Sequence, residues 1–128
     1  MKYLLDTHTF IWWDSNQARL SAAALALCAD KSNILWLSLV SIWELQIKIQ
    51  LNKLSCRLPL ADLITDQQQT NDIELLPIET THIFALDTLP LHHKDPFDRL
   101  LIAQAQVEGA TLISNDPWFD NYAIPRVW

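Results

Sequence analysis

Short runs of apolar residues alternate along the chain with longer segments of helical composition. We predict strands over residues 3–5, 34–40, 73–78 and 111–113, where apolar residues follow one another almost without interruption. Continuous hydrophobicity of this kind is typical of parallel strands that are covered on both faces. Because the strands alternate with helices, we predict an α/β fold, a three-layer α/β/α sandwich around a mostly parallel central sheet.

The intervening segments carry residues that start and stop helices. We predict helices over residues 22–29, 42–48, 59–69, 83–87 and 96–108. Their expected starts are, in chain order, Ser21, Ser41, Pro59, Thr80 or Thr81, and Asp95 followed by Pro96. Serine, threonine and aspartate accept hydrogen bonds from the free N–H groups of a helix start, and proline fits the first turn. The last helix is expected to stop at Gly109, because glycine tolerates the left-handed conformation of a helix end.

Length and composition limit the class of protein. The 128 residues suffice for a single domain over residues 1–128, and half of them are apolar. Nine lysines and arginines face 15 aspartates and glutamates, and this net charge of −6 argues against a simple basic nucleic-acid binder. Gly109 is the single glycine, which excludes glycine-rich phosphate-binding loops. With no signal peptide, no apolar run long enough for a membrane and only two cysteines, we expect a cytoplasmic protein without membrane contact.

Four acidic residues occupy positions that a parallel sheet would bring together. Asp6 follows the first predicted strand, Glu44 lies one turn into the helix after the second, and Asp116 follows the last. Asp98 lies in the first turn of the final predicted helix. In open α/β sheets ligands bind at the carboxyl ends of the strands. Because clustered carboxylates repel one another, a divalent cation such as Mg²⁺ or Mn²⁺ would be needed among them, and the pattern indicates phosphodiester hydrolysis with one or two ions.

Each acid also has a structural explanation. Asp6 and Asp116 can cap the turns that follow them. Glu44 fits a capping box with the serine three residues before it. Asp95 is the expected N-cap of its helix, and Asp98 lies where the helix dipole favours a negative charge. Spacing by itself therefore leaves both interpretations open.

Four segments of the chain together resemble one family. They are LLDTHTFIWW at residues 4–13, SLVSIWELQIKIQLNKL at 38–54, DPFDRLLIAQA at 95–105 and ISNDPWF at 113–119. In this order they resemble the PIN-domain ribonucleases, most closely the VapC-type toxins of bacterial toxin–antitoxin pairs. The resemblance covers essentially the whole chain, and DPFDRLLIAQA is its most specific segment.

The resemblance implies an endoribonuclease that hydrolyses RNA with Mg²⁺ or Mn²⁺ and serves as the toxin of a type II toxin–antitoxin system. The family's catalytic and metal-binding acids correspond here to Asp6, Glu44, Asp98 and Asp116. Its hydroxyl residue near the end of the last strand corresponds to Ser114. The resemblance further implies a homodimer and a groove for a small antitoxin protein.

The neighbours of these acids supply further candidates. Asp95 lies three residues before Asp98 on the same helical side, so either can be the third ligand, and we favour Asp98. His8, Lys48 and Arg99 are candidates for supporting the acids or contacting the substrate. Further candidates for phosphate contact are Lys53, Arg57 and Lys94.

Two local expectations concern turns. Asn52 stands where the family often has glycine, and asparagine is the next-best residue for a left-handed helix end. His92 and His93 are adjacent and have no partner at metal-ligand spacing, so we expect them in a loop.

The competing hypothesis from another class is a non-catalytic PIN-like module that binds RNA or protein. A binder needs no cluster of four acids, which favours the enzyme. A nuclease directed at DNA would differ from the ribonuclease only in its substrate.

Overall fold

The computed structural model describes residues 1–92 and 94–128; His93, and with it part of the expected histidine loop, lies outside the described residues. Within this part of the chain, five strands form one sheet in the order β3-β2-β1-β4-β5. They are β1 (Lys2–Leu5), β2 (Ile34–Ser38), β3 (Glu74–Leu76), β4 (Thr111–Ile113) and β5 (Arg126–Val127). Every neighbouring pair is parallel, which confirms the predicted α/β class.

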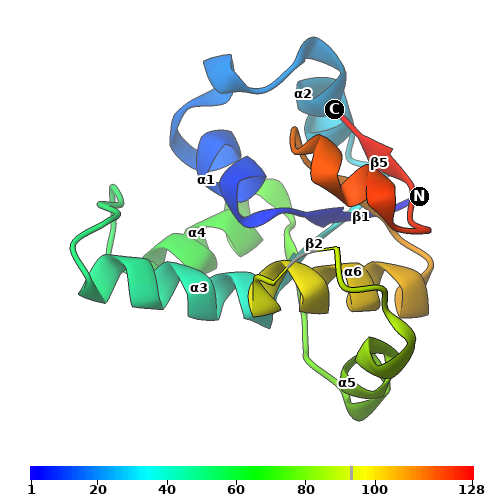
Figure 1. The fold of residues 1–128 in the computed structure, drawn as a ribbon. Coiled ribbons are helices and arrows are strands. Elements are labelled where there is room, and N and C mark those ends of the chain that lie inside the picture. The colour runs from blue at the N-terminus through cyan, green and yellow to red at the C-terminus, as the bar shows by residue number, and fades with distance from the viewer. Residues whose placement is uncertain (93) are drawn as a thin grey trace.

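Helices cover both sides of this sheet. The described residues form α1 (Thr7–Ser15), α2 (Ala22–Ala29), α3 (Leu39–Gln50), α4 (Leu60–Asn71), α5 (Thr80–Ala85) and α6 (Pro96–Glu108). Short 3₁₀ helices are η1 (Gln17–Arg19), η2 (Leu86–Thr88) and η3 (Pro117–Asn121). In Figure 1, α1 and α2 lie above the strands and α6 lies below them, with α5 further out beyond α6.

The side chains of β1 alternate between two separate apolar clusters. Tyr3 and Leu5 belong to a cluster with buried residues of α1, α2 and α4. Leu4 belongs to another, with buried residues of α6 and the C-terminal segment. Because successive residues of a strand point to opposite faces, each face of the sheet has its own core. The predicted three-layer α/β/α sandwich is confirmed.

The strand order reverses at β1, and this positions the site. The chain runs outward from β1 through β2 and β3, then returns to the other side of β1 with β4 and β5. The segments that leave the carboxyl ends of β1 and β4 therefore diverge and open a crevice at that edge. Asp6 lies at the crevice, since its N–H still binds the Ile113 carbonyl of β4 at 3.1 Å.

The second strand is shorter than predicted, and the helix after it starts earlier. Ser38 Oγ accepts a hydrogen bond of 3.0 Å from the Val40 N–H, so Ser38 is the N-cap of α3 and ends the strand. The predictions of a strand to residue 40 and of a cap at Ser41 are wrong, because the apolar residues there suit both strand and helix. Ser41 is buried within α3, and Glu44 takes no part in a capping box.

Four other helix ends agree with prediction. Ser21 accepts a hydrogen bond from the Ala24 N–H and caps α2, and Asp95 caps α6. Gly109 ends α6 in the left-handed conformation, with φ 64°. Asn52, after α3, is also left-handed with φ 57°, as expected for a residue that replaces glycine.

The structure corrects the expected starts of α4 and α5. Pro59 is the N-cap of α4 and does not occupy its first turn. Glu79, rather than Thr80 or Thr81, caps α5, because it forms a capping box with the side chain of His82. Strand β3 spans only part of the apolar run from which it is predicted. Strand β5 is not predicted at all, since a two-residue strand has no detectable periodicity and is defined only by its pairing with β4.

Two further observations concern membranes and cysteines. No helix among the described residues is long and apolar enough to cross a membrane. Cys28 is buried and Cys56 half-buried, and both are free thiols. Burial raises the pKa of the Cys28 thiol to about 11, so this side chain acts as an apolar core residue.

Candidate active site

The four acids that the sequence predicts to converge line one hollow. Asp6, Glu44, Asp98 and Asp116 all border a hollow of about 440 Å³, and Asp95 borders it as well. It lies at the crevice beside the carboxyl ends of β1 and β4. Side chains from separate stretches of the chain thus meet where an open parallel sheet places its ligands.

Asp6 is both the N-cap of α1 and part of the hollow. Its Oδ1 accepts a hydrogen bond of 2.8 Å from the His8 backbone N–H. Its Oδ2 accepts one of 2.5 Å from the Ser114 hydroxyl. Burial raises the pKa of the Asp6 carboxyl, although both hydrogen bonds oppose the shift. The capping interpretation is therefore correct for Asp6, and it is compatible with a place in the hollow.

Ser114 links the first acid to the last. It is fully buried, and its Oγ accepts a hydrogen bond of 3.1 Å from the Asp116 backbone N–H while donating to Asp6. Asp116 caps η3, because its Oδ1 accepts a hydrogen bond of 3.0 Å from the Trp118 N–H. Within the part of the chain described here, Asp116 Oδ2 accepts no hydrogen bond, so it stays available at the hollow.

Glu44 is held from two sides. Thr7 Oγ1 donates a hydrogen bond of 2.9 Å to Glu44 Oε1, and Lys48 Nζ lies 2.8 Å from Glu44 Oε2. Glu44 is only 9% exposed, so these contacts orient its carboxylate more firmly than a solvated ion pair would. Thr7 is a site residue that the sequence does not single out. In the sequence, Thr7 stands out only as a hydroxyl residue directly after Asp6. Its partner Glu44 becomes visible only when α1 packs against α3.

Asp95 and Asp98 differ in their contacts at the start of α6. Asp95 Oδ1 accepts hydrogen bonds from the N–H groups of Phe97 at 2.9 Å and of Asp98 at 3.4 Å. No described residue donates a hydrogen bond to the Asp98 carboxylate. Burial raises the pKa of Asp98 to about 7, and the other acids of the hollow, Asp95 first among them, add to the shift. The negative charge of Asp98 is therefore poorly compensated, which favours Asp98 over Asp95 as a cation ligand.

The remaining candidates differ in where they point. His8 and Lys48 border the hollow, and His8 Nδ1 lies 3.9 Å from Asp6 Oδ1. Arg99 does not border it, because its guanidinium donates hydrogen bonds of 2.9 and 3.5 Å to the carbonyl groups of residues 90 and 89. The prediction that Arg99 supports the acids is therefore corrected, whereas its contact with the substrate stays a prediction. Four further residues border the hollow and are not predicted as site residues from the sequence: Thr7, Trp12, Asn115 and Phe119.

The donor set suits a hydrated Mg²⁺ or Mn²⁺ ion. The four acids offer carboxylate oxygens, which these ions prefer. In the described part of the chain, no three histidine, cysteine, aspartate or glutamate side chains form a ready-made metal cage. Mg²⁺ usually binds through one or two carboxylates and keeps several waters, so a complete cage is not required. The raised pKa values of Asp6 and Asp98 mark carboxylates whose charge a cation would stabilise.

Comparison with known proteins places the chain in a family. The family model for the PIN domain matches residues 3–125. Ribonuclease VapC22 from Mycobacterium tuberculosis (strain ATCC 25618 / H37Rv) is 27% identical over 129 residues, covering 98% of this chain and 97% of that protein.

The similarity to solved structures covers nearly the whole chain. A chain in the crystal structure of VapBC2 from Rickettsia felis, bound to a DNA fragment from their promoter, superposes with a TM-score of 0.75 at 19% identity, covering 99% of this chain and 98% of that one. The DNA-bound VapBC structure from Salmonella typhimurium gives a TM-score of 0.68 at 18% identity, covering 99% and 97% of the two chains. At these identities the likeness shows a shared fold. Since the family model spans nearly all of the sequence, the chain belongs to the PIN domain family.

Proposed function

We propose that this protein is a metal-dependent endoribonuclease that hydrolyses RNA phosphodiester bonds and forms the toxin half of a type II toxin–antitoxin pair. The observation that carries the proposal is the hollow bordered by Asp6, Glu44, Asp98 and Asp116 at the point where the strand order reverses. The relative VapC22, which is named a ribonuclease, supports the same activity. Residues 1–128 would act as one catalytic domain.

The four acids would hold the divalent ion, Mg²⁺ or Mn²⁺. Asp6, Asp98 and Asp116 would be the principal ligands, with Glu44 beside them and Asp95 stabilising the start of α6. When bound, such an ion lowers the pKa of water and stabilises the charge that develops on the phosphate.

Neighbouring side chains orient the acids before any substrate arrives. Ser114 fixes one oxygen of Asp6, and Thr7 and Lys48 each fix one oxygen of Glu44. Preorganised groups of this kind lower the cost of reaching the reactive geometry. The ammonium of Lys48 also brings positive charge to the rim of an otherwise acidic hollow, where it can attract a phosphate.

We further propose that the protein acts in the cytoplasm as a homodimer that binds a small antitoxin protein. Two of the solved structures of similar fold are structures of VapBC2 and VapBC, which supports a protein partner. Large apolar side chains lie exposed on the single chain, as is typical of surfaces that another chain covers. They include Trp43, Leu51, Phe84 and Leu91.

The test uses the purified chain and an end-labelled single-stranded RNA. We expect shorter products in the presence of Mg²⁺ and none after chelation. RNA binding that survives chelation without any product would instead support the non-catalytic module. The same sequence offered as DNA separates a ribonuclease from a nuclease that cleaves DNA.

A cellular experiment tests the toxin role. Expression of the chain alone should arrest growth, and co-expression of a small open reading frame found directly upstream should relieve the arrest. Mapping RNA ends in arrested cells would identify the substrate. Growth that continues while active enzyme accumulates would contradict the toxin role but leave the nuclease in place.

A further inference from the structure

Most of the positive charge in this protein is engaged in internal contacts. Of the nine lysines and arginines, seven contact an acid, a backbone carbonyl or an aromatic ring among the described residues. These seven are Lys2, Arg19, Lys31, Lys48, Arg57, Arg99 and Arg126. Within the described part of the chain, the two left without such a contact are Lys53 and Lys94.

Lys53 lies close to the acidic hollow. Together with Lys48 it borders an adjoining hollow of about 290 Å³, which Glu44, Asp95 and Phe97 also line. Glu44, Lys48 and Asp95 border both hollows, so the two lie next to each other. Lys94, the other lysine without such a contact among the described residues, directly precedes Asp95 in the chain. Both free cations are thus near the acids rather than on a remote face.

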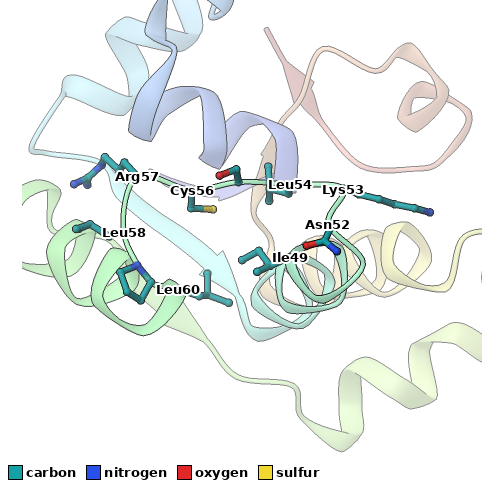
Figure 2. Close-up of a pocket in the computed structure, with 10 residues that line it drawn as sticks. Ile49, Asn52, Lys53, Leu54, Cys56, Arg57, Leu58 and Leu60 are labelled. Carbon is teal, nitrogen blue, oxygen red and sulfur yellow. The ribbon is translucent and has the colours of Figure 1, made fainter.

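The backbone of Lys53 is fixed, whereas its side chain is not. Asn52 turns the chain in the left-handed conformation after α3, and the Lys53 N–H donates a hydrogen bond of 2.9 Å to the Lys48 carbonyl. Figure 2 shows the Lys53 side chain extending away from Cys56 and from the rest of the loop between α3 and α4. The turn therefore fixes where the Lys53 side chain leaves the backbone, and its ammonium group has no acidic partner among the described residues.

We propose that Lys53 is a substrate-positioning residue that binds an RNA phosphate next to the scissile one. The proposal rests on the proposed ribonuclease activity. A chain of net charge −6 with five acids around one hollow repels RNA, so local cations must offset this repulsion. Lys48 is already paired with Glu44 at 2.8 Å, whereas Lys53 has no acidic partner among the described residues. A lysine that contacts one phosphate supplies affinity without sequence preference.

The experiment compares Lys53→Gln, Lys53→Arg and Lys31→Gln in steady-state cleavage of a short single-stranded RNA with Mg²⁺ at several salt concentrations. Lys31 is the matched control, because it pairs with Asp72 on the surface and borders none of these hollows. We expect Lys53→Gln to raise KM about fivefold at low salt with kcat nearly unchanged. The slope of log KM against log salt should fall by about 0.7, the value for one lost contact to a single strand.

The remaining outcomes separate the two proposals. Lys53→Arg should have the same KM and salt slope as the unsubstituted chain, because arginine keeps the positive charge. An unchanged KM and slope in Lys53→Gln, or an equal change in Lys31→Gln, would overturn the role of Lys53 while the ribonuclease activity stands. If the unsubstituted chain cleaves no RNA, the proposed function fails, and the positioning role fails with it.

Discussion

The Ser114 hydroxyl donates a hydrogen bond of 2.5 Å to Oδ2 of Asp6, a residue 108 positions earlier in the chain. Ser114 Oγ also accepts a hydrogen bond of 3.1 Å from the Asp116 backbone N–H, so one buried serine joins the acids that follow β1 and β4. This hydrogen bond lowers the pKa of Asp6 while burial raises it. Ser114 therefore favours the charged form of a carboxylate that burial would otherwise neutralise.

The substitution Ser114→Ala removes one hydrogen-bond donor and one acceptor from the buried site. We expect the free energy of unfolding to fall by about 1–3 kcal/mol, because buried polar groups lose their partners. The pKa of Asp6 should rise further, so the acid limb of the pH–activity profile should move to higher pH. Urea denaturation and RNA cleavage across a pH series measure the two effects.

Two control variants separate the hydrogen bond from simple packing. Ser114→Thr keeps the hydroxyl and should keep the pH profile. Ser15→Ala removes an exposed hydroxyl that donates a hydrogen bond to the Ile11 carbonyl, and it should change neither property. If Ser114→Ala left the pH profile where it was, the coupling between Ser114 and Asp6 would be refuted.

Neutralising single acids tests the catalytic assignment. Asp6→Asn and Asp98→Asn should each lower the rate of RNA cleavage by more than about 100-fold, because each removes a ligand charge at the hollow. Circular dichroism should show that both variants stay folded. Asp87→Asn, which neutralises an exposed acid in η2, is the matched control and should retain activity. Full activity of either site variant would exclude the proposed mechanism.

The raised pKa of Asp98 predicts how stability depends on pH without divalent ions. An aspartate carboxyl ordinarily has a pKa of 3.8, and in the folded chain that of Asp98 is about 7. Between these values the unfolded chain is ionised at this residue while the folded chain is protonated. The stability that Asp98 contributes is therefore complete below about pH 4 and is lost as the pH rises through about 7.

The measurement is the difference in melting temperature between Asp98→Asn and the unsubstituted chain. We expect little difference near pH 4 and a variant more stable by several degrees above pH 7, because asparagine carries no charge to bury. Acids whose pKa is lowered, such as Asp66 and Asp120, make the folded chain less stable as the pH falls. They do so equally in the variant and in the unsubstituted chain, so their effect cancels in the difference. A difference that does not vary with pH would contradict the assigned pKa.

Removal of the divalent ion should stop the reaction. Excess EDTA is expected to abolish cleavage, and added Mg²⁺ or Mn²⁺ to restore it. The same ions should raise the melting temperature of the unsubstituted chain near pH 7, since they bind the folded state and relieve repulsion among the acids. Asp98→Asn should show a smaller increase. Cleavage that persists in excess chelator would contradict metal dependence.

Gly109 provides a test of the fold alone. It ends α6 with φ 64°, and apart from its chain neighbours no atom of the described residues lies within 4 Å of an added Cβ. Gly109→Ala should therefore lower the free energy of unfolding by about 1–2 kcal/mol through backbone strain, without a steric clash. Cleavage at temperatures well below melting should be unchanged. A much larger loss of stability would show that the space around Gly109 is not open.

Local signals account for much of the fold. For α6 the sequence contains Asp95 as cap, Pro96 in the first turn and Gly109 at the end, and the observed helix has these bounds. The start of α3 lacks such a signal, because Leu39 and Val40 suit a strand as well as a helix. There the hydrogen bond of the Ser38 hydroxyl decides where the strand ends, and sequence spacing cannot show it.

By itself, the sequence determined the alternation of strands and helices and the edge at which the acids gather. Parallel strands all end on one side of their sheet, so positions just after strands are neighbours before any packing is known. Only the tertiary structure decided which oxygens are engaged and which are free. Thr7 reaches Glu44, 37 positions later in the chain, and Arg99 turns away to the carbonyls of residues 89 and 90 in the segment before α6. Local periodicity carries no information about contacts of that range.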